Sequence, residues 1–298
     1  MRICFACGSS RCNDVWRCAD CGSQPVTIDG FDAFAPSLAS DNAGFRGEYF
    51  EELAGLEADN FWFRARNELI VWALARYFPD RRSFLEIGCG TGFVLSGIHA
   101  TDQSLELSGS EIFSEGLAFA AARVPSAHFS QMDARHIPYR DEFDVIGAFD
   151  VLEHIDEDEA VLVEVGRALR RGGGFLATVP QHPSLWSLQD EHAHHVRRYT
   201  AAGLRRKTEA AGFEVIRLTS FVSLLLPMLI AARMRTRRRR TDVGFDAIDE
   251  LRQPRALNIA LEAVMTLERT ILRHGLSFPA GGSLLLVARK RVGAEDRP

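Results

Sequence analysis

The sequence predicts an α/β fold in which a mainly parallel sheet carries helices on both faces, preceded by a small cysteine-rich module. Two observations predict the sheet. Short apolar segments alternate with helix-like segments between residues 83 and 180, as in βαβ units. Four of these apolar segments end in Gly or an acidic residue, as expected where parallel strands end at a ligand site. The module is indicated by five of the six cysteines, which lie within the first 21 residues.

Length and charge narrow the possible classes of protein. A chain of 298 residues with 46% hydrophobic content can bury a large core in one or two domains. The net charge of −5 gives no overall attraction to nucleic acid. The first residues do not read as a secretory signal, and the longest apolar stretch, 221–232, contains a proline and is shorter than a bilayer span of ~20 residues. We therefore expect a cytoplasmic protein.

The cysteines predict a zinc site. Two CxxC pairs are separated by ten residues, a spacing typical of zinc ribbons, and a glycine follows each pair. Four thiolates leave no open coordination position, which favours a structural ion; the alternative is a disordered, reducible tail. Cys12 is then spare or a substitute ligand. We predict a zinc-ribbon-like module over residues 1–30, with a structural Zn²⁺ bound by Cys4, Cys7, Cys18 and Cys21.

The segment after the module separates it from the sheet domain. It is rich in Gly, Pro, Ser and Asp and has little periodicity, and we expect residues 31–60 to form a linker. Residues 46–78 also carry apolar residues at helical spacing towards their end, and Pro79 stops that helix. A domain over residues 61–298 would follow the linker.

Five strands are predicted in the central part of the chain. Because parallel strands end at the same edge of a sheet, the residues at their carboxyl ends should meet there: Gly88, Glu111, Asp133 and Asp150. The predicted strands are SFLEIG, LELSGSE, AHFSQMD, FDVIGAFD and GFLATVP.

The stretch FLEIGCGTGF, residues 84–93, predicts close approach of a nucleotide-like ligand to backbone. Its third glycine comes one place too early for a dinucleotide fingerprint, and no lysine follows for a phosphate loop. Glu111 lies 23 positions after Gly88, near the ~20 residues typical of a carboxylate that binds ribose hydroxyls. Asp133 could accept a hydrogen bond from an exocyclic amine. Together these residues indicate a nucleoside held without a phosphate clamp.

In order and spacing these motifs resemble the class I S-adenosylmethionine-dependent methyltransferases. FLEIGCGTGF, SEI, QMDA, FDVIGAFDVLEHI and LRRGGGFLATVP carry the resemblance, which covers roughly 60–220 and the last strand, GGSLLLVARK. It implies a Rossmann-like, seven-stranded sheet that ends in an antiparallel hairpin. It also implies that the glycine loop lies under the methionine part of S-adenosylmethionine, Glu111 holds the ribose and Asp133 flanks the adenine. The implied cofactor-binding residues are Glu86, Gly88, Cys89, Gly90, Gly92, Glu111, Ile112, Asp133, Ala134, Asp150 and Arg64.

The end of the fourth strand offers a candidate metal site. Asp150, Glu153 and His154 resemble the E-x-x-E-H pattern of ubiquinone-type O-methyltransferases, which implies a divalent metal, although the first acid here is Asp. The alternative is that Glu153 and His154 only line the cofactor pocket. His154 is also a candidate catalytic residue.

Candidate bases follow the fifth strand. Residues 180–200 hold four histidines and resemble the DE…H.RRYT segment of a methyltransferase branch that acts on small molecules and on lipid or sugar intermediates. His182 and His195 are the candidate general bases. NFWFRARNE, before the glycine loop, also resembles this branch. Its Trp62 and Phe63 either roof the pocket or belong to the core, and Arg64 or Arg66 would meet the cofactor carboxylate.

Residues 221–280 interrupt the final hairpin as a helical insert. An apolar stretch leads into six arginines within 233–240. Either this is an amphipathic cover helix, or residues 221–240 contact an anionic membrane surface. RNA contact is a third interpretation, disfavoured because aromatic and basic residues do not interleave.

We therefore expect a methyltransferase that acts on a hydroxyl of a small-molecule or lipid-linked metabolite. Alternatives are C-methylation of a sugar, RNA base methylation, and a non-catalytic S-adenosylmethionine-binding module that recruits a partner through its cysteines. The expected location is the cytoplasm, with peripheral contact at the inner membrane surface if 221–240 binds lipid.

Overall fold

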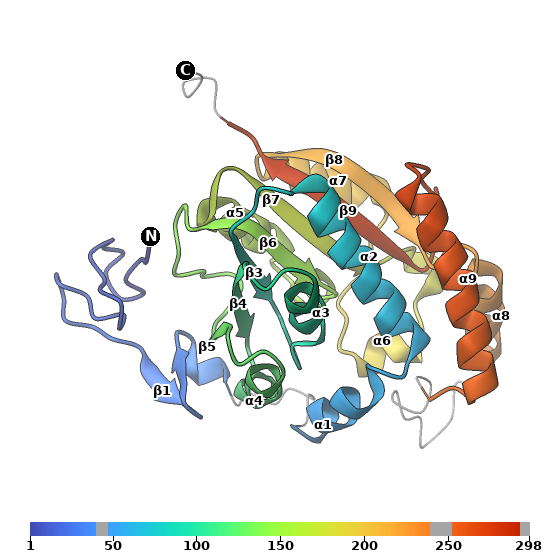
Figure 1. The fold of residues 1–298 in the computed structure, drawn as a ribbon, viewed down its shortest axis with the longest axis horizontal. Coiled ribbons are helices and arrows are strands. Elements are labelled where there is room, and N and C mark those ends of the chain that lie inside the picture. The colour runs from blue at the N-terminus through green and yellow to red at the C-terminus, as the bar shows by residue number, and fades with distance from the viewer. Residues whose placement is uncertain (40–46, 239–251, 293–298) are drawn as a thin grey trace.

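The computed structural model describes residues 1–39, 47–238 and 252–292. Within them one sheet runs through the molecule in the order β1-β2-β5-β4-β3-β6-β7-β9-β8 (Figure 1). The strands are β1 Val26–Ile28, β2 Phe31–Ala33, β3 Ser83–Ile87, β4 Glu106–Glu111, β5 His128–Gln131, β6 Phe143–Phe149, β7 Leu169–Pro180, β8 Phe213–Phe221 and β9 Ser283–Lys290.

The predicted α/β fold is confirmed. Strands β3 to β7 pair in parallel, and β8 and β9 close the sheet as the expected antiparallel hairpin. Every residue of β3 is buried, as expected for a central strand covered on both faces. Between these strands lie the helices α3 Phe93–Thr101, α4 Ser114–Arg123, α5 Asp158–Ala168 and α7 Ala201–Ala210.

Helices cover both faces of the sheet and bury two apolar clusters. Residues of α3, of α4 and of helices α2 Phe61–Tyr77 and α9 Arg255–Arg273 form the cluster on one face. Residues of α5 and α7 form the cluster on the other face. The carboxyl ends of the parallel strands stay clear of these two layers, which leaves that edge available for a site.

The linker prediction for residues 31–60 is corrected. Strand β2 lies within this range and pairs in parallel with β5, and Ala33 is buried. Helix α1, Gly47–Leu56, also lies within it. The Gln131 side chain joins this segment to the sheet by accepting from the Ala35 N–H and donating to the Ala35 carbonyl. A three-residue strand is too short to show periodicity, so only pairing with an open sheet edge defines it.

The helical pattern of 46–78 divides into two helices, α1 and α2. The Asn60 side chain accepts a hydrogen bond from the Trp62 N–H and so caps the start of α2. The break turns α1 away from α2, towards the carboxyl edge of the sheet (Figure 1).

The cysteine module packs beside the segment that follows β5. Trp16 makes edge-to-face contacts with Phe34 and Tyr139, and the Ile3 N–H donates to the Pro138 carbonyl. The module is thereby fixed to the β2 and β5 side of the sheet.

The helical insert lies between β8 and β9, as predicted, and contains α8 Leu226–Arg238 and α9. No helix among the described residues is both long and apolar enough to cross a bilayer. Most of the arginine cluster in 233–240 lies outside the described side chains.

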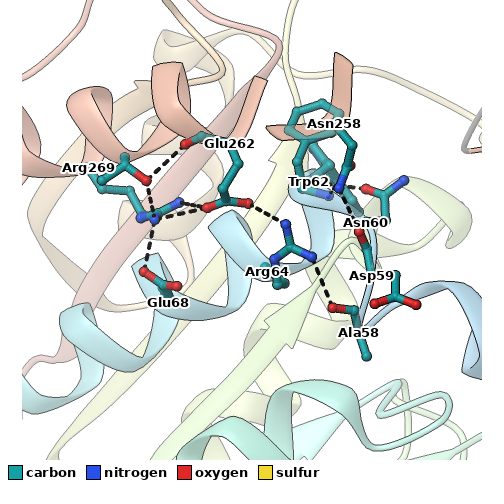
Figure 2. A network of polar contacts seen from close by, with 11 residues as sticks. Ala58, Asp59, Asn60, Trp62, Arg64, Glu68, Asn258, Glu262 and Arg269 are labelled. Atoms are coloured by element: carbon teal, nitrogen blue, oxygen red, sulfur yellow. Dashed lines mark hydrogen bonds and ion pairs between the residues drawn. The ribbon is translucent and has the colours of Figure 1, made fainter. Parts of the chain in front are cut away.

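Helix α9 is fastened to α2 by a polar network (Figure 2). The Glu262 carboxylate pairs with Arg64 at 3.2 Å and with Arg269 at 3.1 Å. The Asn258 side chain accepts from the Phe61 N–H and donates to the Asp59 carbonyl. The insert therefore has a fixed position against the sheet domain.

Candidate functional site

A cavity of about 1280 Å³ opens at the carboxyl ends of β3, β4 and β6. Most of the predicted site residues line it. Among the predicted cofactor-binding and catalytic residues, three do not: Gly92, Arg64 and His182. Those that line it are Glu86, Gly88, Cys89, Gly90, Glu111, Ile112, Asp133, Ala134, Asp150, His154 and His195.

The three loop glycines all have positive φ but meet different surroundings. A Cβ on Gly88 would lie 2.5 Å from the Val151 side chain, and one on Gly92 would lie 2.8 Å from the Ala120 Cα. A Cβ on Gly90 would have no described atom within 4 Å, because that residue faces open space. Gly90 is thus the glycine over which a ligand can approach the backbone, whereas the other two allow close packing. The adjacent Cys89 is buried, which raises the pKa of its thiol.

Glu111 is held against the glycine loop. Its carboxylate accepts hydrogen bonds from the Gly90 N–H at 2.9 Å and the Ile112 N–H at 2.8 Å. Burial raises the pKa of Glu111, while these N–H groups act in the opposite direction. The carboxylate has free lone pairs at the cavity wall and can accept further hydrogen bonds from hydroxyl groups.

Glu86 is a buried acid among the residues that line the cavity. The residue is 2% exposed, and its Oε2 has no hydrogen bond among the described residues. Burial raises its pKa well above the usual value, although Arg66 acts in the opposite direction. A buried carboxylate with an unpaired oxygen is costly when ionised, unless a cationic ligand group lies close to it.

The predicted role of Arg64 is corrected. Arg64 points to the insert and pairs with Glu262, as Figure 2 shows, while Arg66 lines the cavity. Arg66 pairs with Asp150 and lies over the Trp62 ring, 4.6 Å from its centroid. Two positions along a helix turn the side chain by about 200°, so adjacent arginines in RAR face opposite ways. Trp62 and Phe63 also line the cavity.

Asp133 is held by its own neighbour in sequence. The Arg135 guanidinium lies 2.9 Å from its carboxylate and also pairs with Glu157 at 3.0 Å. Burial tends to raise the pKa of Asp133, but hydrogen bonds from Arg135 outweigh it and lower the pKa. An ionised carboxylate that can accept hydrogen bonds therefore lies just after the carboxyl end of β5.

On the opposite side of the cavity, His195 is oriented by a buried acid. Its Nδ1 lies 2.9 Å from Asp190 Oδ1, and Arg198 donates to the same oxygen at 2.7 Å. Burial tends to raise the pKa of Asp190, but these bonds lower it to about 2. Because an ionised carboxylate only accepts, Nδ1 of His195 carries the proton and Nε2 is left as an acceptor.

The candidate metal ligands regroup in the structure. Glu153, His154 and His195 each offer one ligand atom within 4.8 Å of the others. Asp150, the first acid of the predicted trio, is not in this group, because its carboxylate pairs with Arg66. Neither oxygen of Glu153 has a hydrogen bond among the described residues, and burial raises its pKa well above the usual value. Burial, together with His195, lowers the pKa of His154 to about 4, so this imidazole is neutral near pH 7.

His182 is not brought to the cavity. It precedes the short helix η3, Pro183–Leu185, with φ of 63°, and its N–H donates to the Tyr199 carbonyl. This backbone bond fixes the loop, and the side chain is not part of the cavity wall. His182 is therefore corrected from a candidate base to a turn residue.

The four predicted zinc ligands lie together in the N-terminal module. Cys4 and Cys21 sulfurs are 3.6 Å apart, those of Cys7 and Cys18 are 3.7 Å apart, and all four lie within 4.8 Å. Cys12 is outside this group, and burial raises the pKa of its thiol to about 11.

Sequence reasoning missed Asp190 as a site residue. A signal was present, since Ser187 and Asp190 have the spacing of a capping box, and the Ser187 N–H indeed donates to Asp190. No sequence signal indicated the part of the cavity wall that α1 and the residue after it form. It includes Tyr49, Phe50, Leu53 and Glu57.

Comparisons with known proteins agree with this geometry. A family model described as a methyltransferase domain matches residues 58–218. A probable S-adenosylmethionine-dependent methyltransferase of Mycolicibacterium smegmatis is 32% identical over 166 residues, 55% of this chain and 63% of the relative. A fatty-acid O-methyltransferase of the same organism is 33% identical over 102 residues, 33% of this chain and 37% of the relative. The matches thus span less than two thirds of either relative.

A solved structure shows the same fold. Phosphoethanolamine N-methyltransferase 2 of Haemonchus contortus, in complex with S-adenosyl-L-methionine, aligns with a TM-score of 0.57 at 17% identity, over 85% of this chain and 59% of that one. Identity at this level speaks for the fold alone. Since the family model covers more than half of the chain and includes the glycine loop, Glu111 and the end of β6, the chain belongs to the methyltransferase domain family.

Proposed function

We propose that this chain transfers a methyl group from S-adenosylmethionine to a hydroxyl group of a small-molecule or lipid-linked metabolite. One observation carries the proposal: a single cavity joins the glycine loop and Glu111 to the His195–Asp190 pair. Two reactants held in one cavity can be aligned, and alignment alone can lower a barrier by about 7–11 kcal/mol.

The donor side of the cavity fits S-adenosylmethionine. Open space over Gly90 admits a ligand close to backbone, and the buried Glu86 carboxylate on the cavity wall suits a nearby ammonium group. Glu111 would accept from ribose hydroxyls, and Asp133 with Ala134 would flank the adenine. When bound, S-adenosylmethionine supplies an electrophilic methyl group on a sulfonium.

The acceptor side supplies a base. With Nδ1 bonded to Asp190, His195 can take the acceptor proton at Nε2, and the Asp190 charge stabilises the resulting imidazolium. General base catalysis of this kind typically contributes about 10²–10⁴-fold. The fatty-acid O-methyltransferase among the relatives supports an oxygen acceptor.

The direct test is mass spectrometry of metabolite extracts incubated with the protein and an isotope-labelled methyl donor, with His195→Ala as control. We expect a mass gain in a lipid or small-molecule fraction. Label in sugar nucleotides or RNA would favour the alternative acceptors. Donor binding without any S-adenosylhomocysteine formation would contradict the proposal and favour a non-catalytic module.

The Glu153, His154 and His195 group offers a second role for His195, as a metal ligand. Since the proposal uses His195 as the base, we expect turnover to be the same with and without added Mg²⁺. If turnover requires Mg²⁺, the acceptor is activated by a bound metal ion and not by His195 acting as a base.

We also propose a structural Zn²⁺ at the four N-terminal thiolates. Their separations of 3.6 and 3.7 Å are close to the ~3.8 Å edge of a tetrahedron with Zn–S bonds of ~2.3 Å. Metal analysis should find one zinc per chain, retained in Cys12→Ser and lost in Cys18→Ser. Equal zinc content in both variants would contradict the assignment.

Membrane contact through 221–240 stays a prediction. Ile230 and Met234 on α8 are exposed and support it. Co-sedimentation with anionic liposomes but not with neutral ones is the expected outcome, and no co-sedimentation would leave α8 as a cover helix.

A further inference from the structure

The helical insert contributes a mainly apolar wall to the cavity that His195 lines. Leu225, Met228 and Leu229 line it from the α8 side, and Leu257 and Leu261 line it from α9. The insert also contributes Ala232, Arg233 and Gln253 to the lining. At about 1280 Å³ the cavity exceeds the roughly 300–1,000 Å³ typical of pockets for one small ligand. There is room for a second ligand beside the donor, and its far part meets mainly hydrocarbon.

Two of these side chains are exposed although they lie on a cavity wall. Met228 is 49% exposed and Leu257 is 41% exposed. Apolar surface in contact with water costs about 25 cal/mol per Å², so covering this wall with hydrocarbon is favourable. Deeper in the wall Leu225 and Leu261 are buried and belong to the core.

The wall is preformed. Glu268 of α9 accepts from the Ser223 N–H at 2.7 Å and the Leu224 N–H at 2.8 Å, which fixes the chain just before α8. The Glu262 and Asn258 contacts of Figure 2 fix α9 against α2. An occupant therefore gains the burial of its own apolar surface without first ordering these helices.

We propose that the acceptor is an amphiphile whose apolar chain lies along this wall, between α8 and α9, with its polar end towards His195. The inference rests on the proposed function, since it names the substrate class of the same site. It follows from one cavity that holds the proposed base, His195, and a mainly apolar wall from the insert, in which Arg233 and Gln253 are the polar lining residues.

The test measures binding of butanoate, octanoate and dodecanoate, below their micellar concentrations, to the protein saturated with S-adenosylhomocysteine. Each methylene buried on the wall should increase affinity by up to about fourfold, equivalent to ~0.8 kcal/mol. Isothermal titration calorimetry reads this without any turnover. Affinity independent of chain length would overturn the proposal.

Matched variants test where the apolar chain of the acceptor lies. Met228→Asp and Leu257→Asp place a charge on the wall, whereas Ile230→Asp and Leu267→Asp place one elsewhere on the same two helices, at residues 40% and 57% exposed. We expect dodecanoate affinity to fall at least tenfold in the first pair and to stay within twofold in the second. Equal losses in both pairs would contradict the location. S-adenosylhomocysteine affinity and thermal melting confirm that each variant is folded.

The two proposals can fail separately. Chain-length-dependent binding without methyl transfer to any amphiphile would leave the wall assignment in place and contradict the proposed function. Methyl transfer to a short polar acceptor, with no dependence on chain length, would support the proposed function and overturn the amphiphile.

Discussion

The two halves of the cavity are built in different ways. The donor half consists of backbone and strand-end residues: the glycine loop after β3, Glu111 at the end of β4 and Asp133 after β5. The acceptor half consists of side chains from the loop 181–200 and the helical insert, which are far apart in the chain. The donor half is therefore fixed by sheet topology, whereas the acceptor half depends on how covering segments fold over that edge. Mutations should separate the two halves.

The largest expected effect is on turnover in the acceptor half. His195→Ala removes the proposed base, and we expect turnover to fall about 10²–10⁴-fold with donor affinity unchanged. His182→Ala is the matched control, because His182 lies in the same loop but not on the cavity wall. Steady-state kinetics and donor titration measure the two effects. Equal losses of turnover and donor affinity in His195→Ala would contradict the division of the cavity into a donor half and an acceptor half.

The next effect is on affinity in the donor half. Glu111→Gln keeps the size of the side chain but removes its charge, and donor affinity should fall about 10–100-fold, as for a hydrogen bond to a charged group. Glu106→Gln, at the exposed start of the same strand, should bind normally. Calorimetry with S-adenosylhomocysteine is the measurement. Unchanged affinity in Glu111→Gln would remove the ribose assignment.

Substitutions in the glycine loop distinguish the glycine that a ligand approaches, Gly90, from the glycine that packs closely, Gly92. Gly92→Ala should lower the free energy of unfolding by about 2–4 kcal/mol, because its Cβ meets the Ala120 backbone and its φ is positive. Gly90→Ala has room for its Cβ and should cost only about 1–2 kcal/mol, but should weaken donor binding. Denaturant unfolding and donor titration check both. The reverse order of stabilities would contradict the packing role of Gly92.

Glu86 links stability to pH. Burial raises the folded pKa of Glu86 well above the usual value of a glutamate, so between these two pKa values the folded state binds more protons than the unfolded state. Stability without ligand should therefore fall as pH rises from about 5 to 8, and less so in Glu86→Gln. The same variant should bind the donor more weakly. Melting curves at about pH 5 and about pH 8, with and without S-adenosylhomocysteine, test this prediction. The same dependence of stability on pH in the unmodified protein and in Glu86→Gln would contradict it.

The smallest expected effect distinguishes Arg64 from Arg66, which lie two positions apart on α2. Arg64→Ala breaks a partly exposed ion pair to Glu262 and should cost about 1 kcal/mol or less, with donor affinity unchanged. Arg66→Ala should instead reduce donor affinity, because Arg66 lies on the cavity wall beside Asp150. Donor affinity lost in Arg64→Ala alone would restore the original assignment.

The sequence by itself determined the donor half. Strand and helix alternate at fixed spacing, and parallel strands end at one edge, so Gly90, Glu111 and Asp133 meet wherever this topology forms. Only the tertiary structure decided the rest: Arg66 rather than Arg64, His195 rather than His182, and Asp190 as the partner of His195. Those choices depend on the rotation of α2, on the path of a loop and on packing between residues far apart in the chain. The capping-box spacing indicates that Asp190 bonds to Ser187, but no local pattern shows which side chains reach the cavity, because contact across the fold selects them.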